Sequence, residues 1–101
     1  MNNKSLILDI AMNLNRIGNW AVDNFAVKEK RIYFFLDQTT QYINSLNISA
    51  FSDKFKKTFE RFLKEYKLLN QEISLNSKNN EIWGEKIMTW GNILTHRSKL
   101  I

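Results

Sequence analysis

The strongest constraint on the fold is that this chain contains no proline and only three glycines, so little in it interrupts a helix. Proline removes a backbone donor, and glycine costs about 1 kcal/mol relative to alanine inside a helix. Apolar residues recur at steps of three and four through four stretches of the 101 residues, which is the period of one helix face. The sequence therefore predicts an all-α fold.

Size and composition favour a single helical-bundle domain over residues 1–101. The chain is 44% hydrophobic and 13% aromatic, and a chain of this length buries about two-thirds of its unfolded surface, enough for one core. The absence of cysteine excludes disulfides, zinc–thiolate sites and cysteine catalysis, and it fits a cytoplasmic location. No apolar run has the length of a membrane span. The first apolar stretch is interrupted by Asp9 and Asn13, a poor fit to a signal peptide.

Two apolar stripes cover the first half of the chain, over about residues 5–22 and 27–46. The members of each stripe share one helix face. Gly18 falls on the first face, where we expect a neighbouring helix to approach closely and offset the cost of a helical glycine. The stripes consist of Ile7, Ile10, Ala11, Leu14, Ile17, Ala21 and Phe25, and of Ile32, Phe35, Leu36, Thr39, Ile43 and Leu46.

Two further helices are expected in the second half. Ser52 is suited to cap the third helix, because its hydroxyl can accept a hydrogen bond from a backbone N–H at a helix N-terminus. The polar stretch over residues 74–80 predicts a loop before the fourth helix, which Asn79 or Asn80 can cap and which should fray near Ser98. The inner faces consist of Phe55, Phe59, Phe62, Tyr66, Leu69 and Ile73, and of Trp83, Ile87, Trp90 and Leu94.

Whether the helix breaks between the first two stripes decides between two architectures. Asp23 and Asn24 are the only candidates for a break, and the apolar phase runs through them almost unshifted. A break near Asn24 gives an up-and-down four-helix bundle, the fold class that we favour. Without it, one long N-terminal helix over 5–46, about 60 Å long, joins two shorter helices. The two shorter helices could not cover this long helix alone, so the alternative requires an obligate dimer.

Little in the sequence matches what an enzyme or a cofactor site needs. A di-metal site in a helical bundle uses inward-facing carboxylates and Glu-x-x-His steps. Here the single histidine, His96, has Ile93 three residues before it, and no Asp or Glu lies on the four inner faces. His96 is also the only candidate base for a nucleophile, and it lies on the polar side of its helix. We therefore predict no catalytic residue, no metal site and no cofactor.

The basic residues are compatible with electrostatic contact to an acidic protein, to RNA or to DNA. The formal net charge is +5. Lys54, Lys57, Arg61 and Lys64 recur at steps of three and four on the side of the third helix opposite its phenylalanines, and we call them the basic ridge. Such a ridge is compatible with a solvated helix face, and also with nonspecific nucleic-acid binding through phosphate contacts. Nucleic-acid binding is the alternative function carried forward.

Large apolar residues on outer faces favour a different function. Trp20, Val27 and Phe34 are expected to project away from the apolar stripes of their helices. Several such residues on a small domain favour a contact surface. The leading hypothesis is a non-catalytic protein–protein interaction or adaptor module, in which Trp20, Val27 and Phe34 contact a protein partner or a second copy of the chain.

Overall fold

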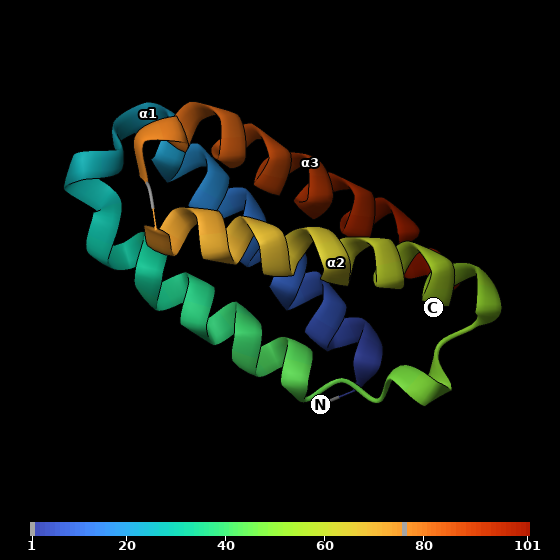
Figure 1. Ribbon diagram of the computed structural model, residues 1–101. Coiled ribbons are helices and arrows are strands. Elements are labelled where there is room, and N and C mark those ends of the chain that lie inside the picture. The colour runs from blue at the N-terminus through green and yellow to red at the C-terminus, as the bar shows by residue number, and fades with distance from the viewer. Residues whose placement is uncertain (1, 76) are drawn as a thin grey trace.

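The computed structural model describes residues 2–75 and 77–101, without the side chains of Leu75 and Ser77. Three α-helices, α1 (Asn3–Asn44), α2 (Asp53–Leu75) and α3 (Asn80–Arg97), make up most of these residues (Figure 1). Single turns of 3₁₀ helix occupy Ile48–Ala50, Ser77–Asn79 and Ser98–Leu100, and the described residues contain no strand. None of the helices in this part of the chain combines the length and hydropathy that a membrane span requires.

A kink at Asn24 divides α1 into two arms, residues 3–23 and 25–44. The Asn24 backbone has φ −156° and ψ 80°, outside the helical region. A straight helix of 42 residues would extend about 63 Å, whereas the longest axis of the molecule is 38 Å. The helix therefore folds back on itself, passing from blue to green in Figure 1. Asn24 Oδ1 accepts from the Val27 N–H at 3.4 Å, as a capping side chain does where a helix begins.

The all-α prediction is confirmed, but a bundle of four separate helices is not, because residues 3–44 form one helix in the structure. The alternative of one long N-terminal helix with two shorter ones fits, with bounds 3–44 in place of 5–46. That alternative assumed a straight helix, which is wrong, because the helix is kinked. The kink folds the two arms together, so residues of both arms are buried in one core with the rest of the chain. The obligate dimer, which was inferred from a straight helix, stays a prediction.

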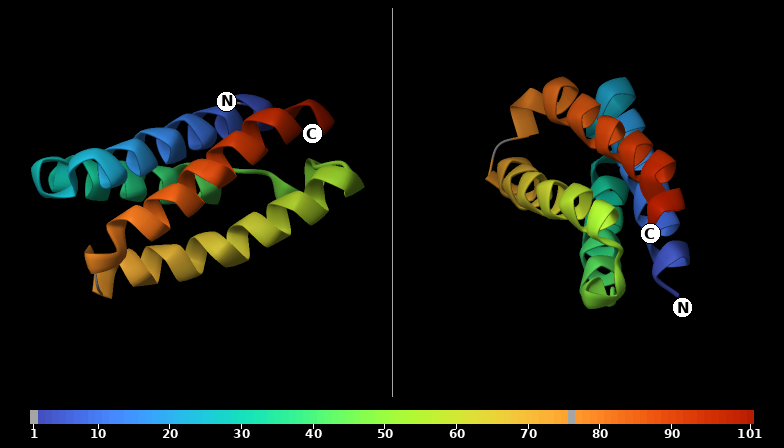
Figure 2. Two further views of the ribbon diagram at one scale, coloured as in Figure 1. Left: turned by 90° about the horizontal axis from the view of Figure 1, so that it is seen from above. Right: turned by 90° about the vertical axis from the view of Figure 1, so that its right-hand side faces the viewer.

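The first arm of α1 and the helix α3 form the closest helix pair. A Cβ atom on Gly18 would lie 2.6 Å from the Gly84 carbonyl oxygen, and one on Gly91 would lie 3.0 Å from the Ala11 carbonyl oxygen. Only glycine leaves this space, so the expected close approach at Gly18 is confirmed. The pairing of Gly18 with Gly84, and of Ala11 with Gly91, makes the two helices antiparallel (Figure 2). We call these four residues the glycine seam.

The helix α2 packs through aromatic rings instead. Its inner face carries a column of rings whose successive centroids lie between 4.9 and 6.3 Å apart, within the range of favourable aromatic pairs. The column continues to Trp90 on α3, which lies 5.7 Å from Phe62. These rings hold the α2 backbone farther from its neighbours than the α3 backbone lies from α1. The column consists of Phe55, Phe59, Phe62 and Tyr66 of α2, together with Phe51, which lies two residues before α2 begins.

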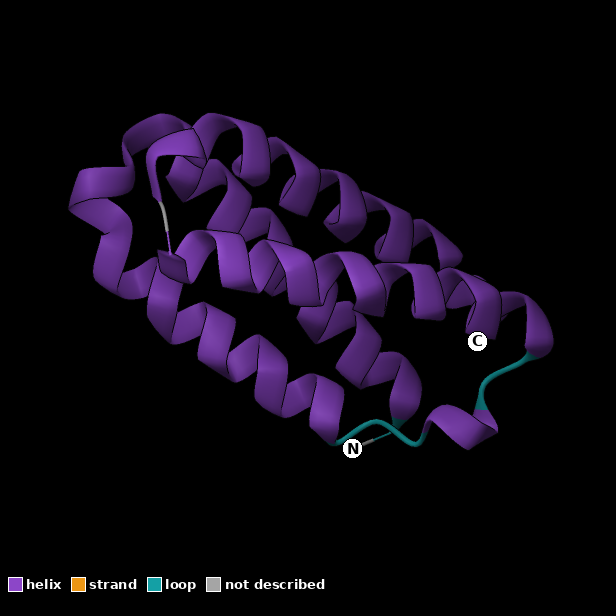
Figure 3. Cartoon of the chain, in the orientation of Figure 1, coloured by secondary structure: helices purple, strands orange, loops and turns teal. Residues whose placement is uncertain are grey.

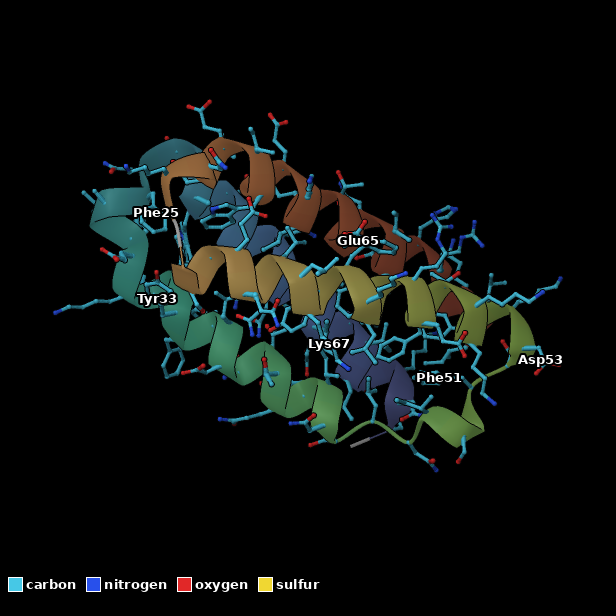
Figure 4. All side chains as sticks on the ribbon, in the orientation of Figure 1. Phe25, Tyr33, Phe51, Asp53, Glu65 and Lys67 are labelled. Atoms are coloured by element: carbon cyan, nitrogen blue, oxygen red, sulfur yellow. The ribbon has the colours of Figure 1, made fainter. Side chains whose placement is uncertain are left out.

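The predicted inner faces form the core. Every member of the four faces is buried except Phe25, Phe35, Leu46 and Trp90, which are half-buried and pack against the rest. Figure 4 places Phe25 and Tyr33 near the kink and Phe51 at the opposite end of the molecule. The hydrophobic periodicity therefore located the core.

The connection between α1 and α2 is tied to the C-terminal residues (Figure 3). Ser52 Oγ accepts from the Phe55 N–H at 3.2 Å, so the predicted N-cap is confirmed. The same hydroxyl donates to the Leu100 carbonyl at 2.5 Å, and the Ser52 N–H donates to the Ile101 carbonyl at 3.2 Å. The helix α3 ends at Arg97, beside the residue where its end was predicted, and Ser98 itself is buried at the start of a 3₁₀ turn.

The connection between α2 and α3 is shorter than predicted. The expected loop over residues 74–80 is mostly helical, because α2 continues to Leu75; Asn76 lies outside the described residues. Asn79 occupies the N-cap position of α3, as one of the two predicted residues, but its side chain makes no capping bond, and Asn80 Nδ2 donates to the Ala21 carbonyl at 2.7 Å. Ala21 lies in the last turn before the kink, where helix carbonyls lose their intrahelical donors.

Candidate functional site

Two of the three predicted contact residues are among the most exposed large apolar side chains of the described chain. Val27 is 70% exposed and Phe34 is 61% exposed. They lie seven residues apart on the second arm of α1, which places them on one face about 10 Å apart. Trp20 differs from the prediction, because it is half-buried against the core. The folded-back second arm covers one side of its ring, which the helix periodicity of the first arm alone could not show.

Trp20 and Phe34 nevertheless both pack against the ring of Phe35, which lies between them. Phe35 lies 5.4 Å from Trp20 and 5.3 Å from Phe34, measured between ring centroids. The Arg16 guanidinium carbon lies 5.8 Å from the centroid of Phe35, a cation–π distance. The structure thus brings aromatic residues of both arms into one surface.

A hollow of about 330 Å³ lies on this surface and is lined by Arg16, Trp20, Arg31 and Phe35. Two of its four lining residues are cationic and none is a carboxylate. The hydrogen bond from Asn13 Nδ2 to Gln38 Oε1, 3.0 Å long, links the same two arms. We call the surface the α1 patch; it consists of Arg16, Trp20, Val27, Arg31, Phe34 and Phe35.

The basic ridge is exposed along its whole length on α2. One member, Arg61, also lines a groove between α2 and α3. The groove has a volume of about 600 Å³, and its lining mixes cationic, neutral polar and apolar side chains. We call it the α2–α3 groove; it is lined by Thr58, Arg61, Thr89, Trp90, Asn92, Ile93, His96 and Arg97.

The sequence does not predict most residues of the groove. Helical periodicity places Trp90 on the inner face of its helix and His96 on the polar side of the same helix. A signal did exist, because Thr89, Ile93 and His96 recur at steps of four and three and so share one edge of α3. What the sequence could not show is that Thr58 and Arg61 of α2 lie across from that edge.

The interior formed by the described residues contains a few hydrogen-bonding side chains but no cluster of charged groups. In the described part of the chain the buried polar side chains are Asn13, Thr39 and Ser98, and no cluster of His, Cys, Asp or Glu could hold a metal ion. Trp83 Nε1 is buried without a hydrogen-bond partner among those residues, which costs about 1–3 kcal/mol. The apolar surroundings of Trp83 stabilise the ring itself.

Tyr66 carries a buried hydroxyl between α2 and the second arm of α1. Its Oη donates to the Leu36 carbonyl at 3.0 Å and lies 2.9 Å from Thr40 Oγ1. Burial raises the pKa of the Tyr66 phenol above its ordinary value, the hydrogen bond with Thr40 opposes this shift, and the charge of Asp37 adds to it. The group is a protonated structural donor at neutral pH, because a raised phenol pKa lies far above that range.

The two surfaces differ in chemistry. The α1 patch combines exposed apolar side chains with two arginines, and the α2–α3 groove combines three basic side chains with hydroxyl and amide groups. Comparison of the chain with protein-family models, with curated proteins and with solved structures gave no match.

Proposed function

We propose that this protein is a non-catalytic interaction module that binds an acidic protein partner through the α1 patch. The observation that carries the proposal is the exposure of Phe34 and Val27 beside the Trp20–Phe35 ring pair. Exposed apolar side chains of this size next to aromatic and arginine residues have the composition of interface hot spots.

The charge of the patch favours a partner of opposite sign. Arg16 and Arg31 line its hollow without a carboxylate, and the whole chain has a formal net charge of +5. In a two-fold dimer built on this patch, each copy would present the same arginines to the other, and like charges at an interface disfavour association. An acidic partner with an apolar centre is complementary in both respects.

We also infer that the two arms of α1, divided at Asn24, are two separate helices of an up-and-down four-helix bundle with α2 and α3. Support comes from the non-helical backbone of Asn24 and from its capping bond at the start of the second arm. Light scattering tests this inference: we expect a monomer of 12.0 kDa, and an obligate dimer would contradict it.

The experiment for the α1 patch compares affinity capture by three forms of the chain. Phe34→Ser combined with Val27→Ser removes the exposed apolar side chains, and Leu68→Ser is the matched control because Leu68 is 56% exposed on α2. We expect the double variant to lose an acidic partner that the wild type and the control retain, with salt weakening the capture.

Both variants change exposed side chains, so each should keep the stability of the wild type within about 0.5 kcal/mol. Equal capture by all three forms, or no acidic partner captured by the wild type, would contradict the proposal. Reversible dimerisation of the wild type that Phe34→Ser abolishes would assign the patch to self-association instead.

A further inference from the structure

The α2–α3 groove contains basic side chains to which the described residues offer no partner. Arg61, His96 and Arg97 line it, and within the described residues none of their side chains has a hydrogen-bond or ion-pair partner. No carboxylate lines the groove. Thr58 and Asn92, which also line it, add a neutral hydroxyl and an amide group that can donate to phosphate oxygens, whereas the Thr89 hydroxyl already donates to the Glu85 carbonyl at 2.9 Å. Such a lining is complementary to an anion with several acceptor atoms.

The groove also contains a ring beside its charges. Trp90 is half-buried: it packs on Phe62 of α2 at 5.7 Å while it lines the groove. Trp90 also lines a neighbouring hollow of about 290 Å³, whose charged residues are Arg61, Lys64 and Glu65. An aromatic ring between cations is the arrangement on which unpaired bases stack in proteins that bind single-stranded nucleic acid.

The positive surface extends beyond the groove along α2. The basic ridge, from Lys54 to Lys64, covers about 15 Å of helix and shares Arg61 with the groove. This length exceeds what one phosphate group needs. It fits a strand of several nucleotides better than a free mononucleotide.

We propose that the α2–α3 groove binds single-stranded nucleic acid, with phosphates on Arg61, His96 and Arg97 and a base against Trp90. The site lies on a different surface from the α1 patch, and the proposal does not depend on that patch. A duplex keeps its bases stacked inside, so it could offer only its phosphates to the groove. An acidic protein is disfavoured here, because the apolar side chains of the groove, Trp90 and Ile93, are both half-buried.

The test measures fluorescence anisotropy of a labelled short oligouridylate with the full chain at about 50 mM salt. We expect a dissociation constant on the order of 10⁻⁵ M or tighter. Phosphate contacts from Arg61 and Arg97 should give a slope of about −1.4 for the logarithm of the association constant against that of salt concentration, at about −0.7 for each cationic contact with a single strand. An abasic strand of the same length, which lacks the stacking group, should bind about tenfold more weakly.

Two nearly isosteric variants locate the site. Asn92→Asp puts a negative charge in the groove, and Asn19→Asp makes the same change at an exposed position of α1 away from the groove. We expect Asn92→Asp to raise the dissociation constant at least about fivefold, and Asn19→Asp to change it by less than about twofold. Arg61→Glu and Lys30→Glu form a second matched pair, with an expected loss of about tenfold for Arg61→Glu alone.

Several outcomes would overturn the proposal. Equal losses within each matched pair would mean that net charge drives the binding and that the groove is not the site. Equal binding of the abasic strand, of a duplex or of polyglutamate would exclude stacking on Trp90. Failure of oligouridylate to bind at low salt would remove nucleic acid as a ligand, and it would leave the proposed function of the α1 patch unaffected.

Discussion

Gly18 and Gly84 face each other so closely that a Cβ atom on Gly18 would lie 2.6 Å from the Gly84 carbonyl oxygen, and one on Gly84 would lie 3.2 Å from the Gly18 carbonyl oxygen. The contact is reciprocal, because each glycine leaves room for the backbone of the other. Close backbone approach of this kind gains dispersion contacts that larger residues would prevent.

Gly18→Ala should destabilise the protein by about 2 kcal/mol. The added methyl group meets the Gly84 carbonyl and the Met88 side chain, and a backbone carbonyl cannot move aside as a flexible side chain can. This cost exceeds the gain in helix propensity of about 1 kcal/mol. Urea denaturation followed by circular dichroism measures the change.

Gly84→Ala is a control for this measurement, because its added methyl group would be less crowded than that of Gly18→Ala. Its Cβ would meet the nearest atoms at 3.0 to 3.2 Å, and two of those three atoms belong to side chains. The loss should therefore be smaller, under about 1 kcal/mol. A Gly18→Ala variant as stable as the wild type would show that the two helices are not in such close contact.

Ser52→Ala should cost about 1–2 kcal/mol, because one hydroxyl serves two elements. It accepts from the Phe55 N–H at the start of α2 and donates to the Leu100 carbonyl. Ser52→Thr keeps the hydroxyl and should retain most of the stability. Thermal denaturation of the three forms tests this, and equal midpoints for the alanine variant and the wild type would contradict it.

Tyr66 should make the protein less stable at high pH. Its pKa is raised in the folded state, so above the ordinary value of about 10 the unfolded chain loses this proton first. The contribution is fully present below pH of about 10 and is lost as pH rises toward the folded pKa.

Tyr66→Phe isolates this effect. The variant should lose about 1 kcal/mol at neutral pH, because it lacks the hydrogen bond to the Leu36 carbonyl. The gap in unfolding free energy between wild type and variant should then narrow above pH of about 10. Denaturant titrations at pH values on both sides of 10 provide the measurement. A gap that does not change with pH would contradict the role given to burial of the phenol.

The sequence predicted helix content and core membership well, since both follow from local periodicity. The phenylalanine face of α2 is buried as expected, and Gly18 signalled a close helix contact before its partner Gly84 was known. The break at Asn24 was harder to predict. Neither glycine nor proline marks it, and the apolar phase continues through it.

What the sequence could not provide was any feature made by two helices together. The half-burial of Trp20 depends on Phe35 of the other arm, and the α2–α3 groove depends on Arg61 lying across from His96. Asn80 likewise appeared to be a cap, but the kink left the Ala21 carbonyl in need of a donor. Each of these relationships joins residues at least 15 positions apart, beyond the reach of helical periodicity.

The first arm of α1 and α3 pack through direct backbone contact, whereas α2 packs through aromatic side chains, and the two kinds of packing should differ in local stability. Backbones in direct contact along the glycine seam should open last, and their amides should exchange with solvent most slowly. The backbone of α2 is separated from the other helices by aromatic rings, so its amides should exchange with solvent sooner. A ligand that bridges the α2–α3 groove would hold α2 against α3, so its binding should slow amide exchange along the whole of α2, including turns of the helix that the ligand does not touch.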